Sequence, residues 1–441
     1  MEIIEKLLKE VPEGNIPMTT TNSPSETITI YNGQFILKEK DLQRLCEGSI
    51  TFNWLPTFQT RVHFKILEGK SLINEQMNNE QRDVLIDSSL LGKLILLNSI
   101  NSDSGTTYMG ILTGEITWGD RKIQVDKIIF EIPNLKEFIG EGIKTGTNVR
   151  KGRITLENDK YIITLDKIFD FNTQYRKLES YGGYIFLYSG MLTKKKGSLN
   201  FDEAKTTLEC LHWFLSFVNG SRTSAMFIKG VANEQLIWQN YNSRHVDQFK
   251  TVWSWSPKFR IDGLKDLWSN FLLINKDPDD FDCLTTSIHW YIEANKGSGY
   301  AEGSIMMIQN ALELLFNWQV VEKNKIIKGS DSRNITASNK IRLLLFLIKQ
   351  THEIPDGLEF LKQIADGKDG PEIIVEIRNA IVHGNEDKRK KLKDISGEAL
   401  YQSMQLGLLY IELTLLYIMN YKGEYTNRCV THASVIQTEK F

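Results

Sequence analysis

Two side chains near the C-terminal end of the sequence have the types and spacing needed for phosphate chemistry. Arg378 and His383 are separated by four residues in the segment RNAIVHG at positions 378–384. A guanidinium stays charged at any accessible pH and can hold a phosphate and neutralise developing charge. An imidazole titrates near neutrality and can transfer a proton. Together these two groups have the chemistry needed to cleave RNA.

The same segment is expected to lie at the end of a short helix. Pro371 suits the first helical turn, and Gly384 suits the C-terminal end. Arg378 and His383 would then lie about 140° apart around the helix axis, so the two groups of one helix are poorly placed to bind the same phosphate. We therefore expect a composite site in which two copies of the chain face each other across a two-fold axis. The core-facing stripe of this helix comprises Ile373, Ile374, Ile377, Ala380 and Ile381.

Neighbouring polar residues extend this hypothesis. Asn379 precedes His383 by one turn and can position it through an i,i+4 contact. The alternative is that His383 is a surface histidine paired with a glutamate. A basic loop, GNEDKRKKLKD, follows at 384–394 and suits the backbone of an RNA, although such a run can also be merely solvated. Its basic residues are Lys388, Arg389, Lys390, Lys391 and Lys393.

The motif resembles that of the HEPN superfamily of metal-independent ribonucleases. In that superfamily an arginine and a histidine are separated by four to six residues, and a polar residue follows the arginine. The resemblance carries over to Arg378, Asn379 and His383. It implies a bundle of four or five helices whose active site forms across a dimer and in which the RNA 2′-hydroxyl attacks the adjacent phosphate. The layout of a β-rich N-terminal half joined to such a bundle is similar to the ApeA-like anti-phage branch.

This resemblance implies an endoribonuclease of an abortive-infection system. Its products would be a 2′,3′-cyclic phosphate and a 5′-hydroxyl, and transfer RNA is a candidate substrate. The N-terminal half would sense a phage component, and the helical domain would form a homodimer or a larger homo-oligomer. Two alternatives stay open: a non-catalytic HEPN-like module that binds RNA or protein, and a plain helical dimerisation domain with an accidental motif.

Apolar periodicity predicts further helices in the C-terminal third. The helix at 302–323 is apolar around most of its circumference and should be central. Glu313 lies with Asn310 and Asn317 on its polar stripe, which makes Glu313 a secondary site candidate or part of an internal hydrogen-bond network. The last helix holds Glu412 in too short an apolar stretch to span a membrane. The other predicted helices cover 285–295, 338–350, 358–364 and 398–421.

The N-terminal half has the composition of a β-rich domain. Segments rich in β-branched and aromatic residues alternate with turn residues, which indicates a sandwich or a distorted barrel. One helix is expected at 201–217 and one hairpin at 226–241. The predicted strand segments are 27–37, 49–54, 60–67, 93–97, 108–118, 123–132, 153–171 and 184–192.

The sequence therefore predicts an α+β multidomain protein. Residues 1–245 form a β-rich sensing or regulatory domain, 246–282 a bridging segment, and 283–441 the HEPN-like helical bundle. The bridging segment holds Trp253, Trp255 and Trp268, interpreted as interdomain packing rather than as a base-stacking platform.

Composition narrows the function classes further. The chain has 441 residues with 41% hydrophobic content, enough for full cores, and its net charge of −2 means that RNA affinity must come from local patches. Four cysteines lie far apart and seven histidines show no zinc spacing, so we expect no metal and no cofactor. The charged opening, MEIIEKLLKE, predicts a short helix rather than a signal peptide, and a reducing cytoplasmic location is expected.

Overall fold

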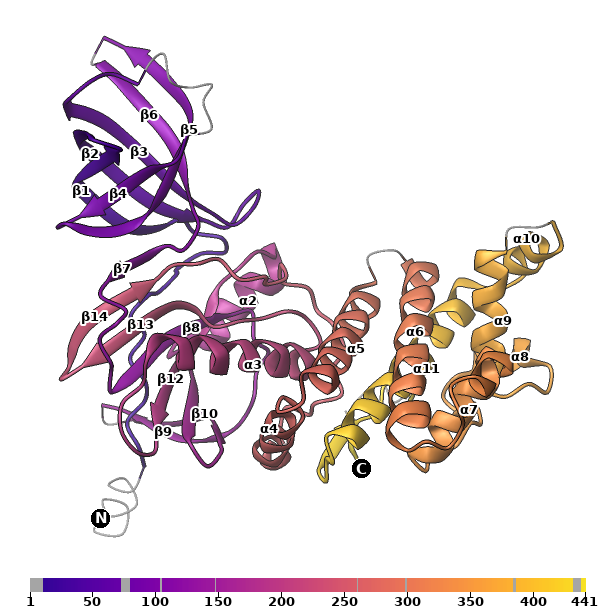
Figure 1. Cartoon of the computed structure of the whole chain (residues 1–441). Coiled ribbons are helices and arrows are strands. Elements are labelled where there is room, and N and C mark those ends of the chain that lie inside the picture. The colour runs from indigo at the N-terminus through magenta and orange to yellow at the C-terminus, as the bar shows by residue number, and fades with distance from the viewer. Residues whose placement is uncertain are drawn as a thin grey trace. The chain divides into compact units, whose positions relative to one another are not determined.

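The computed structural model describes residues 11–72, 80–103, 105–146, 148–259, 261–297, 300–383, 386–430 and 438–441. The predicted N-terminal helix, Gly384 and His432 lie outside these ranges. The chain divides into two compact units, one of Met1–Glu137, Glu141–Leu211 and Thr223–Lys250, the other of Phe138–Gly140, His212–Arg222 and Thr251–Phe441. The N-terminal half is β-rich and the C-terminal half is helical, as predicted (Figure 1).

Six strands of the first unit close into an antiparallel barrel in the order β1-β2-β3-β6-β5-β4. Closure comes from residues 36–38 of β1, which pair with residues 83–85 of β4. Alternate side chains fill the interior, among them Phe35, Ile50 and Val62. The strands are β1 Ile28–Glu39, β2 Leu42–Asn53, β3 Gln59–Glu68, β4 Arg82–Ile86, β5 Ser89–Ser102 and β6 Gly105–Thr113.

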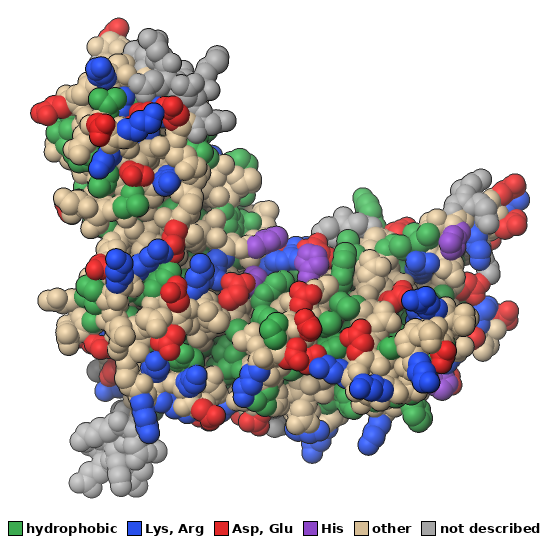
Figure 2. Space-filling view, in the orientation of Figure 1, with side chains coloured by type: hydrophobic (Ala, Val, Ile, Leu, Met, Phe, Trp, Pro, Cys, Tyr) green, Lys and Arg blue, Asp and Glu red, His purple; other side chains and the backbone are tan. Residues whose placement is uncertain are grey.

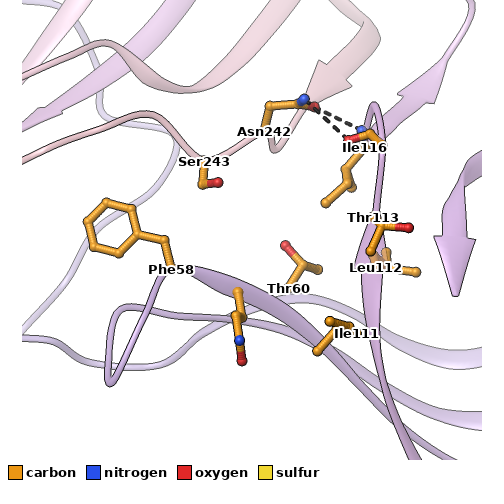
Figure 3. Close-up of a pocket in the computed structure, with 10 residues that line it drawn as sticks. Phe58, Thr60, Ile111, Leu112, Thr113, Ile116, Asn242 and Ser243 are labelled. Atoms are coloured by element: carbon orange, nitrogen blue, oxygen red, sulfur yellow. Dashed lines mark hydrogen bonds between the residues drawn. The ribbon is translucent and has the colours of Figure 1, made fainter. Parts of the chain in front are cut away.

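A cavity of about 250 Å³ lies where β3 and β6 separate. The two strands pair through Arg61 and Ile111, and beyond this pair residues 59–60 of β3 and 112–113 of β6 line the cavity instead of pairing with each other. Figure 3 shows Asn242 on the opposite side, where its Oδ1 accepts a hydrogen bond of 2.8 Å from the Ile116 amide. No charged side chain lines this cavity.

The other strands of the first unit form an antiparallel sheet of eight strands in the order β7-β14-β13-β8-β12-β11-β10-β9. The predicted hairpin at 226–241 is confirmed, and the predicted segment 153–171 is mostly a second hairpin, β10-β11. The helices are α2 Phe171–Tyr181, which was not predicted, and α3 Phe201–Asn219. The strands are β7 Thr117–Gly119, β8 Lys127–Pro133, β9 Glu141–Thr145, β10 Asn148–Glu157, β11 Tyr161–Lys167, β12 Phe186–Lys194, β13 Met226–Ala232 and β14 Gln235–Asn240.

Residues 13–22, here called the N-terminal strap, lie over buried polar groups of this sheet. The backbone amide of Asn15 donates a 2.6 Å hydrogen bond to the carboxylate of Asp166 on β11. The amides of Met18 and Thr19 donate to one carboxylate oxygen of Glu131 on β8, at 2.9 and 3.2 Å. Burial raises the pKa of Glu131 to about 7. The strap therefore replaces water as the hydrogen-bond partner of these carboxylates.

The helical unit contains the predicted helices, with boundaries moved by several residues. The segment predicted as one helix at 302–323 is α6 followed by a π-helical turn, η1 Asn317–Lys323. The prediction of a basic loop at 384–394 is wrong, because residues 386–393 form helix α10. The elements are α4 Asp262–Ile274, α5 Pro278–Lys296, α6 Tyr300–Phe316, η2 Asp331–Asn334, α7 Ala337–Leu347, α8 Glu359–Ala365, α9 Gly370–Val382, α10 Glu386–Lys393, α11 Gly397–Ile418, β15 Glu424–Thr426 and β16 Thr438–Lys440.

Helix α6 is central, as predicted, and packs against α5, α7, α9 and α11. Trp255 and Trp268 are buried and pack inside this unit, against Phe217 and Phe214 at ring-centroid distances of 5.1 and 5.2 Å. Trp253 is exposed. Two of the three bridging tryptophans therefore belong to the core of the helical unit.

Candidate active site

Helix α9 begins where its sequence predicts. Asp369 caps the helix, because its carboxylate accepts a 2.9 Å hydrogen bond from the Glu372 amide, and Pro371 occupies the first turn. Gly370 lies so close to α11 that an added Cβ would be 2.2 Å from the hydroxyl oxygen of Tyr410. A glycine is therefore required at the point where the start of α9 meets α11.

Ion pairs tie the N-terminal half of α9 to its surroundings. Arg342 of α7 pairs with Asp369 and, at 2.9 Å, with Glu372. Lys368 pairs with Glu376 at 3.2 Å. The carboxylates of this part of the helix thus have basic partners of their own. These ion pairs engage the carboxylates that precede Arg378 and His383 on the helix.

Arg378 differs from these groups because no carboxylate balances it among the residues that the structure describes. Its side chain is half-buried, and Nη1 donates a 3.0 Å hydrogen bond to Oδ1 of Asn379. Its Nε is buried and has no hydrogen-bond partner. Burying a donor without a partner costs about 1 to 3 kcal/mol. The guanidinium has therefore lost part of its water without gaining an anion.

His383 follows the last residue of α9 and is exposed. Its backbone amide donates a 3.0 Å hydrogen bond to the carbonyl oxygen of Asn379. The Asn379 side chain contacts Arg378, so the link from Asn379 to His383 runs through the backbone and not through the side chain that we expected to position it. Val382 beside it is 42% exposed. The end of α9 thus presents an imidazole and an apolar side chain to solvent.

The predicted RNA-binding residues lie on α10, which packs against α9. Acidic residues start this helix and lysines end it, an order that favours helix formation through the helix dipole. Lys390 pairs with Glu386 at 2.8 Å, and both side chains are exposed. Lys388 is half-buried, and the side chains of Arg389 and Lys391 lie outside the described atoms. Figure 2 shows basic, acidic and histidine side chains close together at this end of the helical unit.

Glu313, the secondary candidate, pairs with Lys340 of α7 at 2.6 Å. Its side chain is 48% exposed, and Asn310 on the same stripe is also exposed. In the described part of the chain, no hydrogen bond or ion pair joins Glu313 to Arg378 or His383. The polar stripe of α6 therefore faces solvent rather than an internal network.

The residues that the structure describes contain no group of three or more His, Cys, Asp and Glu side chains arranged to hold a metal ion. None of their helices combines the length and the apolar character needed to cross a membrane.

Comparison with known proteins places the candidate residues inside one matched region. Residues 277–439 match the YopA C-terminal domain, and residues 120–252 match the YopA central domain. The first range begins at the N-cap of α5 and includes α5 to α11, and the second includes β8 to β14. No solved structure matches the chain. The chain is 26% identical over 412 residues to the SPbeta prophage-derived uncharacterized protein YopA of Bacillus subtilis (strain 168), and the alignment covers 92% of each protein.

Proposed function

We propose that the chain is a metal-independent endoribonuclease of the HEPN type, with Arg378 and His383 as its catalytic pair. One observation carries the proposal: a half-buried arginine without a carboxylate partner lies five residues before an exposed histidine at the end of one helix. A guanidinium in this state gains more from binding a phosphate than a guanidinium that is already paired. The histidine supplies the proton transfer.

The proposed reaction is transesterification within the RNA. The 2′-hydroxyl oxygen forms a bond to the adjacent phosphorus, and the bond from phosphorus to the 5′-oxygen breaks. Arg378 neutralises the negative charge that grows on the phosphoryl oxygens. The 2′-hydroxyl gives up its proton and the leaving 5′-oxygen takes one up, so the step neither gains nor loses a proton overall. His383 acts as the acid or the base in these transfers, or as a further phosphate ligand. The products are a 2′,3′-cyclic phosphate and a 5′-hydroxyl.

Two copies of the chain are proposed to complete the site. The spacing of five positions from Arg378 to His383 corresponds to about 140° around the axis of α9, so the two groups of one copy point in different directions. Facing copies would bring the arginine of one toward the histidine of the other. The exposed Val382 beside His383 gives this contact an apolar component.

The biological setting is proposed by analogy. The resemblance to ApeA-like proteins and the prophage-derived relative both fit a cytoplasmic role in conflict between phage and host. In this role the β-rich half senses a phage component, the ribonuclease stays inactive until then, and transfer RNA is the candidate substrate.

Cleavage in the presence of EDTA tests the catalytic proposal. We expect the full chain to cut total RNA or transfer RNA to products with 2′,3′-cyclic phosphate ends. Arg378→Ala and His383→Ala should each lower the rate at least about 100-fold. Arg333→Ala and His352→Ala, at exposed positions of the same unit, serve as matched controls and should cut at the wild-type rate. Equal cleavage by all variants would remove Arg378 and His383 from the mechanism.

The second candidate function is an RNA-binding module without catalysis. It is favoured by the exposed basic helix α10. A mobility shift with transfer RNA, together with intact RNA after long incubation, would support this alternative. Cleavage that disappears in both catalytic variants would exclude it.

A further inference from the structure

A second arginine whose Nε is buried without a hydrogen-bond partner lies in the first unit, at a cavity of about 560 Å³. The cavity is lined by the N-terminal strap, by residues 144–146 and 150 of the β9-β10 hairpin, by residues 168–170 between β11 and α2, and by Phe186 of β12. Cavities that bind small ligands span roughly 300 to 1,000 Å³. The barrel cavity of Figure 3 is smaller, at about 250 Å³, and has no charged lining residue.

Strand β10 carries two arginines in different states. Arg153 donates to both carboxylate oxygens of Asp166, at 2.8 and 2.7 Å, and this hydrogen bonding raises the pKa of Arg153. Arg150 lines the cavity, and its Nη2 donates to the carbonyl oxygen of Lys167. The Nε of Arg150 is buried without a partner, and burial lowers the pKa of Arg150 although the charge of Asp166 opposes this shift. Arg153 takes both oxygens of Asp166, whereas no carboxylate is hydrogen-bonded to Arg150 among the described residues.

The acidic residues of the cavity wall already have partners. Asp170 accepts a 2.6 Å hydrogen bond from Nε2 of Gln174, and Glu13 pairs with Lys144 at 3.5 Å. Neither carboxylate is hydrogen-bonded to Arg150 among the described residues. The positive charge of Arg150 is therefore available to an anion that enters the cavity.

Threonine hydroxyls add donors to the same wall. Oγ1 of Thr19 accepts a 2.9 Å hydrogen bond from Lys229, and Oγ1 of Thr21 accepts one of 3.3 Å from the Phe186 amide. A hydroxyl that accepts in this way still has its own proton to donate. Both threonines line the cavity, so their protons supplement the guanidinium as donors to an anion.

An aromatic ring forms another part of the wall. Phe169 is 72% exposed, which is unusual for a phenylalanine, and it lines the cavity. Flat rings stack on exposed aromatic side chains, and arginine binds phosphate with two parallel hydrogen bonds. The cavity thus offers a place for a phosphate and a place for a flat ring.

We propose that this cavity binds a small phosphate-bearing ligand with a flat ring, of the size of a nucleoside monophosphate. The phosphate lies against Arg150 and the threonine hydroxyls, and the ring lies against Phe169. The site belongs to the first unit alone and does not depend on the ribonuclease proposal.

Calorimetric titration of the full chain with AMP, GMP, CMP and UMP tests this site, with adenosine and inorganic phosphate as partial ligands. At least one monophosphate should bind at concentrations up to about 1 mM. Arg150→Gln should weaken that binding at least tenfold, because it removes a charge-assisted hydrogen bond. Arg61→Gln, on barrel strand β3, is the matched control and should leave the affinity unchanged. Phe169→Ala should weaken the monophosphate at least threefold and leave inorganic phosphate unaffected.

Three results would overturn the proposal. They are the failure of every monophosphate to bind, an affinity that Arg150→Gln leaves unchanged, and adenosine or inorganic phosphate binding as tightly as the best monophosphate. Thermal unfolding shows whether Arg150→Gln still folds. If it does not, Phe169→Ala decides alone, because its exposed ring is not part of a core, and unchanged affinity in that variant would reject the site.

Discussion

Two arginines of the helical unit, Arg428 and Arg378, show opposite ways of using a buried charge. Arg428 is fully buried and donates to both carboxylate oxygens of Glu412 on α11. Tyr291 of α5 donates a 2.6 Å hydrogen bond to the same carboxylate. Although burial opposes the charged form, the Glu412 carboxylate raises the pKa of Arg428. Arg378 is hydrogen-bonded only to the Asn379 amide oxygen among the described residues and keeps a buried Nε without a partner.

This difference separates charges that hold the fold together from charges that are available to a ligand. The Arg428 network joins α5, α11 and the segment after β15, so it stabilises the fold. Among the described residues, the Arg378 guanidinium is hydrogen-bonded only to Asn379, the next residue of the same helix, so it joins no two elements of the fold. The same contrast recurs on β10, where Arg153 is paired with Asp166 and Arg150 is not. An arginine without a carboxylate therefore marks each place where we propose that an anion binds.

The largest expected effect is on stability, at Arg428. Arg428→Met leaves the Glu412 carboxylate buried without a cation, which should lower the free energy of unfolding by about 3 to 5 kcal/mol. Arg378→Met removes a guanidinium that lacks an anion and should change it by less than about 1 kcal/mol. Urea unfolding of each variant, followed by tryptophan fluorescence, measures both changes.

The two variants should also differ in activity. Arg378→Met is expected to unfold like the wild type and to lose cleavage, so stability and activity separate at this position. If Arg378→Met were as unstable as Arg428→Met, Arg378 would be a structural residue. The distinction between the two arginines would then fail.

The helices that sequence could predict are those with an apolar stripe and clear ends. Helix α9 has Pro371 at its start and isoleucines at helical spacing. Helix α10 was missed because it has no apolar stripe, although glutamate and lysine favour helices and its charges follow the helix dipole. Helix α2 was missed because Phe171, its first residue, ends a stretch rich in β-branched residues.

The sequence alone does not show which distant groups pair, either in the fold or in the site. Alternating apolar residues predict strands but not that β1 pairs with β4, which closes the barrel. The types and spacing of Arg378 and His383 were visible in the sequence. The sequence did not show whether Glu376 or Glu313 would pair with Arg378 or His383. In the structure Glu376 pairs with Lys368, just before α9, and Glu313 pairs with Lys340 of α7.

A smaller effect is expected from Glu131, a buried carboxylate that is bound by backbone amides of the strap instead of an arginine. Its pKa is raised from 4.5 to about 7 in the folded protein, so the folded state holds an extra proton between these values. Its contribution to stability is complete below pH 4.5 and is lost as the pH rises through 7. The free energy of unfolding should fall by about 1 to 3 kcal/mol over this window.

Glu131→Gln isolates this contribution, because glutamine keeps the shape and the acceptor oxygen but does not titrate. Urea midpoints measured between pH 4.5 and 8 should fall less steeply for Glu131→Gln than for the wild type. Glu179→Gln, at an exposed position on α2, should keep the wild-type slope. Identical slopes for wild type and Glu131→Gln would show that this carboxylate ionises without cost to the folded state.

The smallest effect is expected at Lys390, whose charge is paired but fully hydrated. Its exposed ion pair with Glu386 contributes only a few tenths of a kcal/mol, so Lys390→Gln should barely change stability. If α10 binds an RNA backbone, Lys390→Gln should weaken binding of transfer RNA and reduce the slope of log affinity against log salt by about 1. Lys362→Gln removes another exposed lysine with a carboxylate partner, on α8, and is the matched control.

Glu386→Gln tests the same site with the opposite sign. This variant removes the carboxylate that competes with phosphate for Lys390, so transfer RNA should bind more tightly and with a steeper salt dependence. An exposed pair in water is exchanged for phosphate at little cost, whereas the buried pair of Arg428 cannot be exchanged at all. If Lys390→Gln and Lys362→Gln give the same salt slope and Glu386→Gln leaves binding unchanged, α10 does not contact RNA. Arg378, which has no carboxylate partner among the described residues, would then remain as the proposed phosphate contact.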